Sequence, residues 1–79
     1  MALQEEVVAV VSRVIKTPAS DLSAESGLGS VGRWDSMAHT NLVLELEDAF
    51  DVSFDFEELD RIVTVTAIVE SLRAKGVSC

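Results

Sequence analysis

Several residue types on which common functions depend are scarce in this chain. Its 79 residues include one cysteine, Cys79, so no internal disulfide bond can form, which suits a reducing compartment. They also include one histidine, His39, which has no cysteine or second histidine as a metal partner. Without a second candidate base or a recognisable catalytic triad, the sequence predicts neither a metal site nor an enzyme. His39 lies toward the core side of its helix, and we expect it to be packed or half-buried.

Basic residues and long apolar runs are scarce as well. Six Lys and Arg stand against 14 Asp and Glu, which gives a net charge of −8 and a pI near 4.3. Such a charge repels nucleic acids and anionic membranes and favours basic protein partners. No apolar run is long enough to span a bilayer, and acidic residues occupy the N-terminus where a signal peptide is basic. We therefore expect a cytoplasmic protein that binds neither nucleic acid nor a membrane.

The residues that are abundant favour one small domain over residues 1–79. Hydrophobic residues make up 48% of the chain, which is enough for a core. An apolar stripe with helical spacing predicts a first helix over about residues 2–16, which Thr17 and Pro18 end. The stripe consists of Leu3, Val7, Val10 and Val14.

The next segment, residues 17–34, is rich in glycine and serine and predicts a long surface loop. Within it, residues 27–32 (GLGSVG) match the glycine pattern of dinucleotide-binding loops. That fingerprint needs a strand before it and a crossover helix with a second strand after it. SDLSAES precedes it here, so we interpret the motif as a flexible loop. The apolar residues of the segment that we expect to contact the core are Leu22, Leu28 and Val31.

Three further helices complete the predicted fold. The second covers residues 36–50, with Asp35 as its N-cap. A short third helix starts at Asp55, which forms a capping-box-like pair with Glu58. The fourth extends from its N-cap Thr64 to about residue 75. The sequence therefore predicts an all-α fold, a small four-helix bundle with a long loop between helices one and two and a short third helix.

The acidic residues from Asp48 to Asp60 invite interpretation as a calcium site. An EF-hand loop needs alternating oxygen ligands and a glycine at its sixth position, and no register of this segment supplies both. Loose binding of divalent cations is the interpretation that remains, without a dedicated site.

The second helix carries apolar residues on the side that we expect to face solvent. At about 100° per residue, Met37 and Leu44 point away from the side that carries the other large apolar residues. That core side consists of Ala38, Leu42, Val43, Leu46, Ala49 and Phe50. All the charged residues from Asp35 to Asp60 are acidic. Isolated exposed apolar residues are common, but apolar residues within an acidic surface favour a docking face for basic partners.

Ser36 lies at the start of this helix, at its positive end. A phosphate attached there meets a favourable dipole and free backbone N–H groups. Taken alone, a serine at such a position is usually a helix cap. The position by itself leaves both interpretations open.

Three parts of the sequence are similar to the acyl carrier protein family: the step Asp35-Ser36-Met37, residues 42–52 (LVLELEDAFDV), and Thr64-Val65 at the start of the last helix. The family carries 4′-phosphopantetheine, transferred from coenzyme A, on the serine of an Asp-Ser-Leu motif that opens the second of four helices. The resemblance implies that Ser36 is the attachment site and that Asp35 assists the phosphopantetheinyl transferase. It also implies a partner face made of Met37, Leu44, Glu47, Asp48 and Asp60.

Thr40, Phe54 and Phe56 depart from the family pattern, and we add them to the expected partner face. The resemblance implies a monomer without chemistry of its own, which carries an acyl group as a thioester in fatty acid, polyketide or related biosynthesis. Its partners are acyl-loading and acyl-using enzymes with basic docking surfaces. An apolar chain is expected to be sheltered by Leu42, Leu46, Ile62 and Ile68. Aminoacyl and D-alanyl carriers use an Asp-Ser step too and remain alternatives, as does an unmodified acidic adaptor that binds basic proteins.

Overall fold

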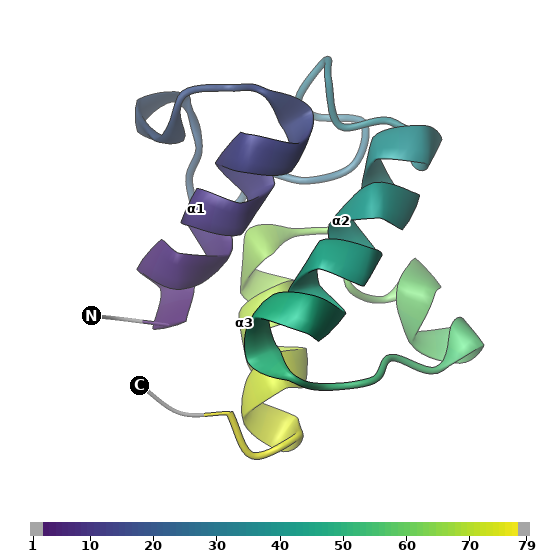
Figure 1. Cartoon of the computed structure of the whole chain (residues 1–79). Coiled ribbons are helices and arrows are strands. Elements are labelled where there is room, and N and C mark those ends of the chain that lie inside the picture. The colour runs from purple at the N-terminus through teal and green to yellow at the C-terminus, as the bar shows by residue number, and fades with distance from the viewer. Residues whose placement is uncertain (1–2, 78–79) are drawn as a thin grey trace.

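The computed structural model describes residues 3–77, and its regular elements are helical (Figure 1). They are α1 (Leu3–Ile15), η1 (Ala19–Asp21), α2 (Ser36–Phe50), η2 (Phe56–Asp60) and α3 (Val65–Ala74), where η marks a 3₁₀ helix. The all-helical prediction is confirmed, whereas the four-helix bundle is not, because the described residues form three α-helices and two 3₁₀ helices. No helix in the described part is long and apolar enough to cross a membrane. Cys79 and the predicted start of the first helix at residue 2 lie outside the described residues.

The predicted third α-helix is the 3₁₀ helix η2. The Glu58 carboxylate accepts the Asp55 N–H at 3.1 Å, which is one half of the expected capping box. The backbone bonds then span three residues, because the Glu58 N–H bonds to Asp55 and the Arg61 N–H bonds to Glu58. Thr64 is already extended, with φ −133° and ψ 162°, and caps the next helix. The segment is therefore too short for an α-helix to propagate and forms a 3₁₀ turn.

Helix α1 packs against both α2 and α3, and the apolar side chains of all three meet in one core. The predicted stripe of α1 is largely correct but is wider than predicted, because a helix that contacts two others buries more than one narrow row. The buried residues of α1 are Leu3, Val7, Val10, Val11 and Ile15, and Val14 is half-buried.

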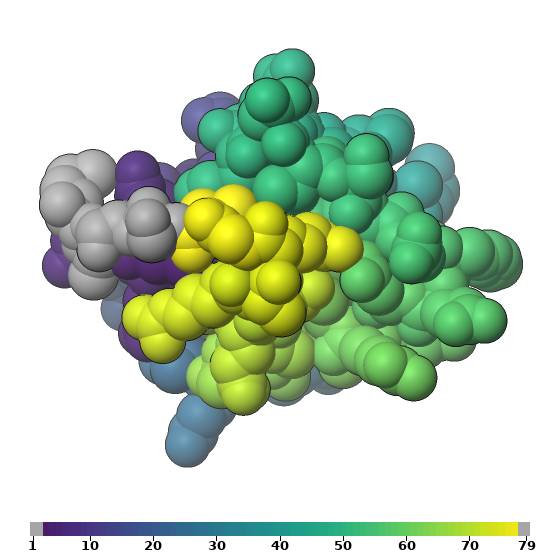
Figure 2. All heavy atoms as spheres, turned by 90° about the horizontal axis from the view of Figure 1, so that it is seen from below, coloured from purple at the N-terminus to yellow at the C-terminus, as the bar shows by residue number. Residues whose placement is uncertain are grey.

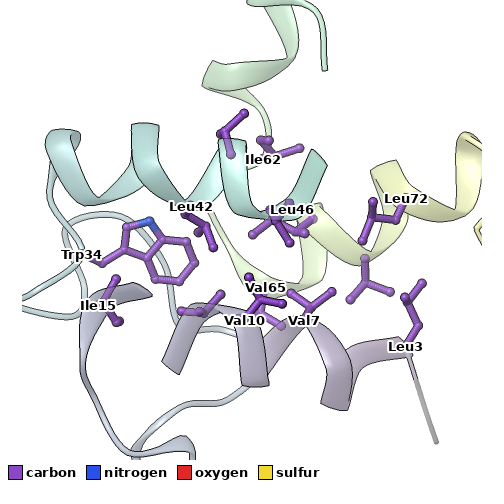
Figure 3. Packing of buried hydrophobic residues seen from close by; sticks show 14 residues of the cluster. Leu3, Val7, Val10, Ile15, Trp34, Leu42, Leu46, Ile62, Val65 and Leu72 are labelled. Atoms are coloured by element: carbon purple, nitrogen blue, oxygen red, sulfur yellow. The ribbon is translucent and has the colours of Figure 1, made fainter. Parts of the chain in front are cut away.

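Trp34 closes one end of this core. Its side chain is 1% exposed and lies beside Ile15 and Leu42 (Figure 3). The helical periodicity of the sequence did not identify it, because Trp34 belongs to the loop that precedes α2. The chain entering α2 is thus fixed to the core immediately before Asp35 and Ser36.

Helix α2 begins and ends at the predicted residues. The Asp35 carboxylate accepts the Ala38 N–H at 2.9 Å and caps its start. Its end is formed by Asp51, which adopts the left-handed conformation (φ 54°) and donates its N–H to the Glu47 carbonyl. Ala49, predicted to face the core, is exposed because it lies at the edge of the buried arc and its methyl group is short. The residues of α2 that are buried are His39, Leu42, Val43 and Leu46.

The glycine-rich motif at residues 27–32, interpreted as a flexible loop, begins where the backbone of the loop is bonded to the segment that opens α3. The bonds join the Leu28 N–H to Val63 (2.8 Å), the Val65 N–H to Ser26 (3.0 Å) and the Thr66 N–H to Ala24 (3.0 Å). Leu22 and Val31 pack against the core as predicted. Leu28 does not; it is exposed, and its side chain lines a surface cavity together with Ser36.

The end of α3 lies against the segment that connects α2 to α3, seen as adjoining yellow and green surfaces in Figure 2. As predicted, the Thr64 hydroxyl caps α3 by accepting the Ala67 N–H at 3.1 Å. The helix faces the core with Val65, Ile68, Val69 and Leu72.

Candidate functional site

Ser36 is the first residue of α2, and its side chain is exposed. Because Asp35 occupies the capping position, a capping role does not explain the serine. Within residues 3–77, the Ser36 hydroxyl and the N–H groups of Ser36 and Met37 have no hydrogen-bond partner. Free N–H groups at the positive end of a helix favour a bound phosphate. Ser36 thus carries an exposed hydroxyl next to two free backbone N–H groups at the start of a helix.

A surface cavity of about 240 Å³ lies beside Ser36, between α2 and η2. Aliphatic side chains form its wall, and the exposed Thr40 and Asp60 lie at its polar edge. The Thr40 hydroxyl donates to the Ser36 carbonyl at 3.1 Å. The cavity suits a short apolar chain that begins near Ser36. Its lining residues are Leu28, Ser36, His39, Thr40, Val43, Leu59, Asp60 and Val63.

The residues predicted to shelter an apolar chain are not those that line this cavity. Leu42, Leu46, Ile62 and Ile68 are at most 1% exposed and belong to the packed core. The sequence distinguishes apolar from polar positions, but the packing of η2 decides which apolar residues border a cavity.

The predicted apolar face of α2 is exposed. Met37 is 78% exposed and Leu44 is 59% exposed, although Leu42 between them is fully buried. Asp48 on the same helix is also exposed. On η2, the aromatic ring of Phe56 is exposed as well. The exposure predicted for Met37 and Leu44 is thus observed, and a docking role for this surface stays a prediction.

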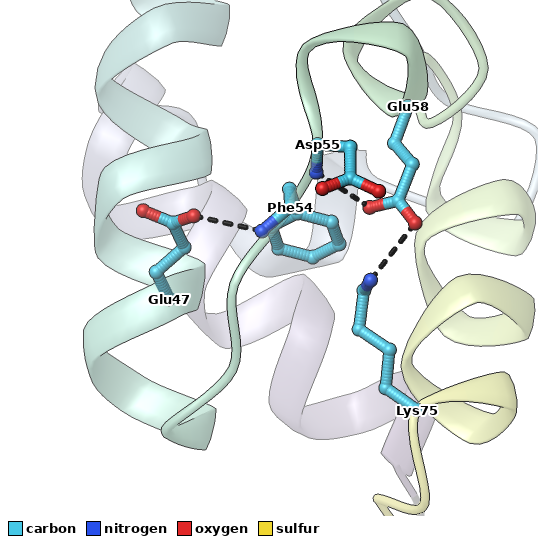
Figure 4. A network of polar contacts seen from close by, with 5 residues as sticks. All are labelled: Glu47, Phe54, Asp55, Glu58 and Lys75. Carbon is cyan, nitrogen blue, oxygen red and sulfur yellow. Dashed lines mark hydrogen bonds and ion pairs between the residues drawn. The ribbon is translucent and has the colours of Figure 1, made fainter.

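Two other residues of the predicted partner face hold the fold together and are not free. The Glu47 carboxylate accepts the Phe54 N–H at 2.8 Å, and its side chain is half-buried (Figure 4). Phe54 packs against the core, with the Lys75 ammonium 5.1 Å from the centre of its ring. The structure therefore assigns these two side chains to the connection between α2 and η2.

The Lys75 ammonium also forms an ion pair with Glu58, at 2.9 Å (Figure 4). The hydrogen bond from Lys75 lowers the pKa of Glu58 below 4.5, its ordinary value; the Asp55 N–H lowers it further, and desolvation opposes both. This pair fixes η2 to the end of α3.

His39 is buried, as predicted, with 8% of its surface exposed. The Trp34 indole N–H donates to Nδ1 of His39 at 2.9 Å, and Nε2 of His39 lies 3.2 Å from the Leu59 carbonyl. The planes of the two rings are inclined by 28°, with their centres 6.1 Å apart. Trp34 is the residue near the site that sequence reasoning missed. Its place directly before the Asp-Ser step was the signal that could have found it.

Comparison with known proteins gives consistent matches. The family described as "Phosphopantetheine attachment site" matches residues 5–72. The chain is 26% identical over 78 residues to an acyl carrier protein of Syntrophus aciditrophicus, covering 99% of this chain and 98% of that protein. It is 33% identical over 61 residues to a probable acyl carrier protein of Caulobacter vibrioides, covering 73% of this chain and 71% of that protein.

Proposed function

Because the chain belongs to the family of phosphopantetheine-bearing acyl carrier proteins, we propose that Ser36 is the residue to which its 4′-phosphopantetheine is attached. The protein is a carrier and not an enzyme, and it interacts with enzymes that modify carriers and handle acyl groups. The observation that carries the assignment is the division of roles at the start of α2. Asp35 caps the helix, which leaves the Ser36 hydroxyl exposed and unbonded within residues 3–77.

When bound, the group supplies a flexible arm whose terminal thiol holds the acyl cargo as a thioester. The residues of this chain do the rest. The free N–H groups of Ser36 and Met37 would be available to hold the attached phosphate, and the helix dipole would stabilise its charge. The aliphatic wall around Leu59 and Val63 takes up the apolar atoms nearest to Ser36. In this arrangement η2 stands in the place of the third helix of a four-helix bundle, and residues 1–79 form one carrier domain.

The partner enzymes dock on the exposed face of α2 and η2. Met37, Leu44 and Phe56 provide apolar contacts, and Asp48 and Asp60 attract basic side chains around them. Asp35 lies beside the acceptor hydroxyl, where it can contact the transferase. The net charge of −8 opposes association of two copies, so we infer that the carrier acts as a monomer.

Intact mass spectrometry tests the attachment site. Wild type is incubated with coenzyme A and a promiscuous phosphopantetheinyl transferase, next to Ser36→Ala and the matched control Ser53→Ala, which changes another exposed serine. We expect wild type and Ser53→Ala to gain the mass of one arm and Ser36→Ala to fold and gain none. Modification of Ser36→Ala would move the site elsewhere. Failure of wild type to accept the arm would favour the unmodified acidic adaptor.

A further inference from the structure

The Trp34–His39–Leu59 link fixes the tautomer of a buried histidine. The indole N–H is a donor only, so Nδ1 of His39 must carry a lone pair. The Leu59 carbonyl is an acceptor only, so Nε2 must carry the proton. Both nitrogens of the ring are therefore occupied, one on each side. His39 therefore links Trp34, in the loop before Ser36, to the backbone of η2 by two hydrogen bonds of fixed direction.

This link is a direct polar contact between η2 and α2, in addition to the apolar packing of Leu59 against the core. Among residues 3–77, the bond from His39 to Leu59 is the one hydrogen bond that joins these two elements directly. The other polar anchor of η2 is the ion pair of Glu58 with Lys75, which fixes it to α3. Leu59 and the adjacent Asp60 line the cavity beside Ser36, and so does the His39 ring.

We propose that His39 is a positioning residue which, oriented by Trp34, holds η2 at a set distance from Ser36 so that enzymes meet the serine, the cavity and Asp60 as one surface. The proposal rests on the assignment of Ser36 as the attachment site. In this role His39 acts through Leu59 and Asp60, which line the cavity beside Ser36. Without the bond to Leu59, the start of α2 is still capped by Asp35, but η2 is less firmly attached to it.

Two substitutions separate the halves of the link. In His39→Asn the amide occupies the place of Nδ1, which keeps an acceptor for Trp34 but loses the donor to Leu59. In His39→Gln the longer side chain brings its amide to the place of Nε2, which keeps the donor to Leu59 but loses the acceptor for Trp34. A role in positioning η2 predicts that glutamine rescues function and asparagine does not. If His39 served only to fill space in the core, glutamine would not restore function better than asparagine.

The experiment measures steady-state modification of the unmodified protein by a phosphopantetheinyl transferase. For His39→Asn we expect a KM for the carrier raised about fivefold or more, with kcat within about twofold of wild type, because Ser36 itself is unchanged. For His39→Gln we expect a KM within about twofold of wild type. Val69→Ala, which truncates a buried residue of α3, is the control for lost stability and should leave KM unchanged.

Fluorescence of Trp34, the one tryptophan of the chain, reports the other half of the link. Its emission should stay as in wild type in His39→Asn and shift in His39→Gln. If His39→Asn does not fold, His39→Leu replaces it; this apolar side chain occupies the site but cannot donate to Leu59, so it should also raise KM. An unchanged KM in the folded Asn or Leu variant overturns the proposal, as does an equal rise in Asn, Gln and Val69→Ala. An unmodified wild type is the distinct result that overturns the attachment site instead.

Discussion

The Lys75 ammonium and the Glu58 carboxylate lie 2.9 Å apart and join the end of α3 to η2, across 17 residues of sequence. The same ammonium lies over the ring of Phe54, whose N–H is bonded to Glu47 at the end of α2. One basic residue thus connects the end of α3 to η2 and to the segment that follows α2. Its loss should loosen the attachment of η2 to α3.

The stabilisation from Glu58 should depend on pH. Its folded-state pKa is lowered, chiefly by Lys75, so it stabilises the fold above its unfolded-state pKa, and this stabilisation is lost as the pH falls through the folded-state pKa. We expect wild type to be more stable than Glu58→Gln at neutral pH, and the difference to vanish in acid. Urea denaturation over this pH range measures it, with the exposed neighbour Glu57→Gln as a control that changes little. A difference that persisted in acid would contradict the pairing.

Gly27 should be intolerant of a side chain. A Cβ at this position would overlap the Val63 carbonyl oxygen and approach the Thr64 methyl group to 2.9 Å. We expect Gly27→Ala to cost about 1–3 kcal/mol of unfolding free energy, as overpacked sites do. Gly32→Ala, in the same loop but with nothing within 4 Å of the new Cβ, should cost much less. Equal melting temperatures for the two variants would mean that the loop does not need to dock on α3.

These glycines show where sequence reasoning succeeds and where it stops. The bounds of α2 follow from local information, because Asp35 caps one end and the helical period continues to Phe50. The exposure of Met37 and Leu44 follows from the same period. The glycine-rich motif has no such period. Whether residues 24–28 move freely or pair with residues 63–66 depends on contacts across more than 30 positions, which composition does not encode.

The same limit applies to the candidate site. Ser36 and Asp35 are identified by a short local motif, and the structure assigns the capping role to the aspartate. The burial of Trp34 and the structural use of Glu47 are tertiary facts, since their partners His39 and Phe54 come together through the packing of the chain around α2. The partner face expected from the family resemblance therefore includes side chains, such as that of Glu47, that already make contacts within the fold.

Added salt should stabilise the fold. With a net charge of −8 and the acidic residues concentrated around α2 and η2, repulsion is stronger in the compact state than in an expanded chain. Screening reduces this repulsion, so we expect the melting temperature to rise between low and moderate ionic strength, and to rise further with millimolar divalent cations. Calorimetry at a series of salt concentrations measures it. An unchanged melting temperature would show that the acidic surface is not strained.

Leu42 and Leu44 are two residues apart on α2, yet Leu42 is fully buried and Leu44 is 59% exposed, which makes them a matched pair for the docking face. Leu42→Ala should cost about 2–5 kcal/mol of stability, whereas Leu44→Ala should cost well under 2 kcal/mol because it removes little buried surface.

The order of the two variants should reverse for function. An apolar contact inside a charged rim carries much of the binding energy, so Leu44→Ala should weaken use of the modified carrier by an acyl-transferring enzyme. Asp48→Lys should mainly slow association, and raised salt should mask its effect. Thermal melting beside transfer kinetics decides the matter: a Leu44→Ala variant that loses stability but transfers acyl groups normally would place Leu44 in the core and leave α2 without its apolar anchor.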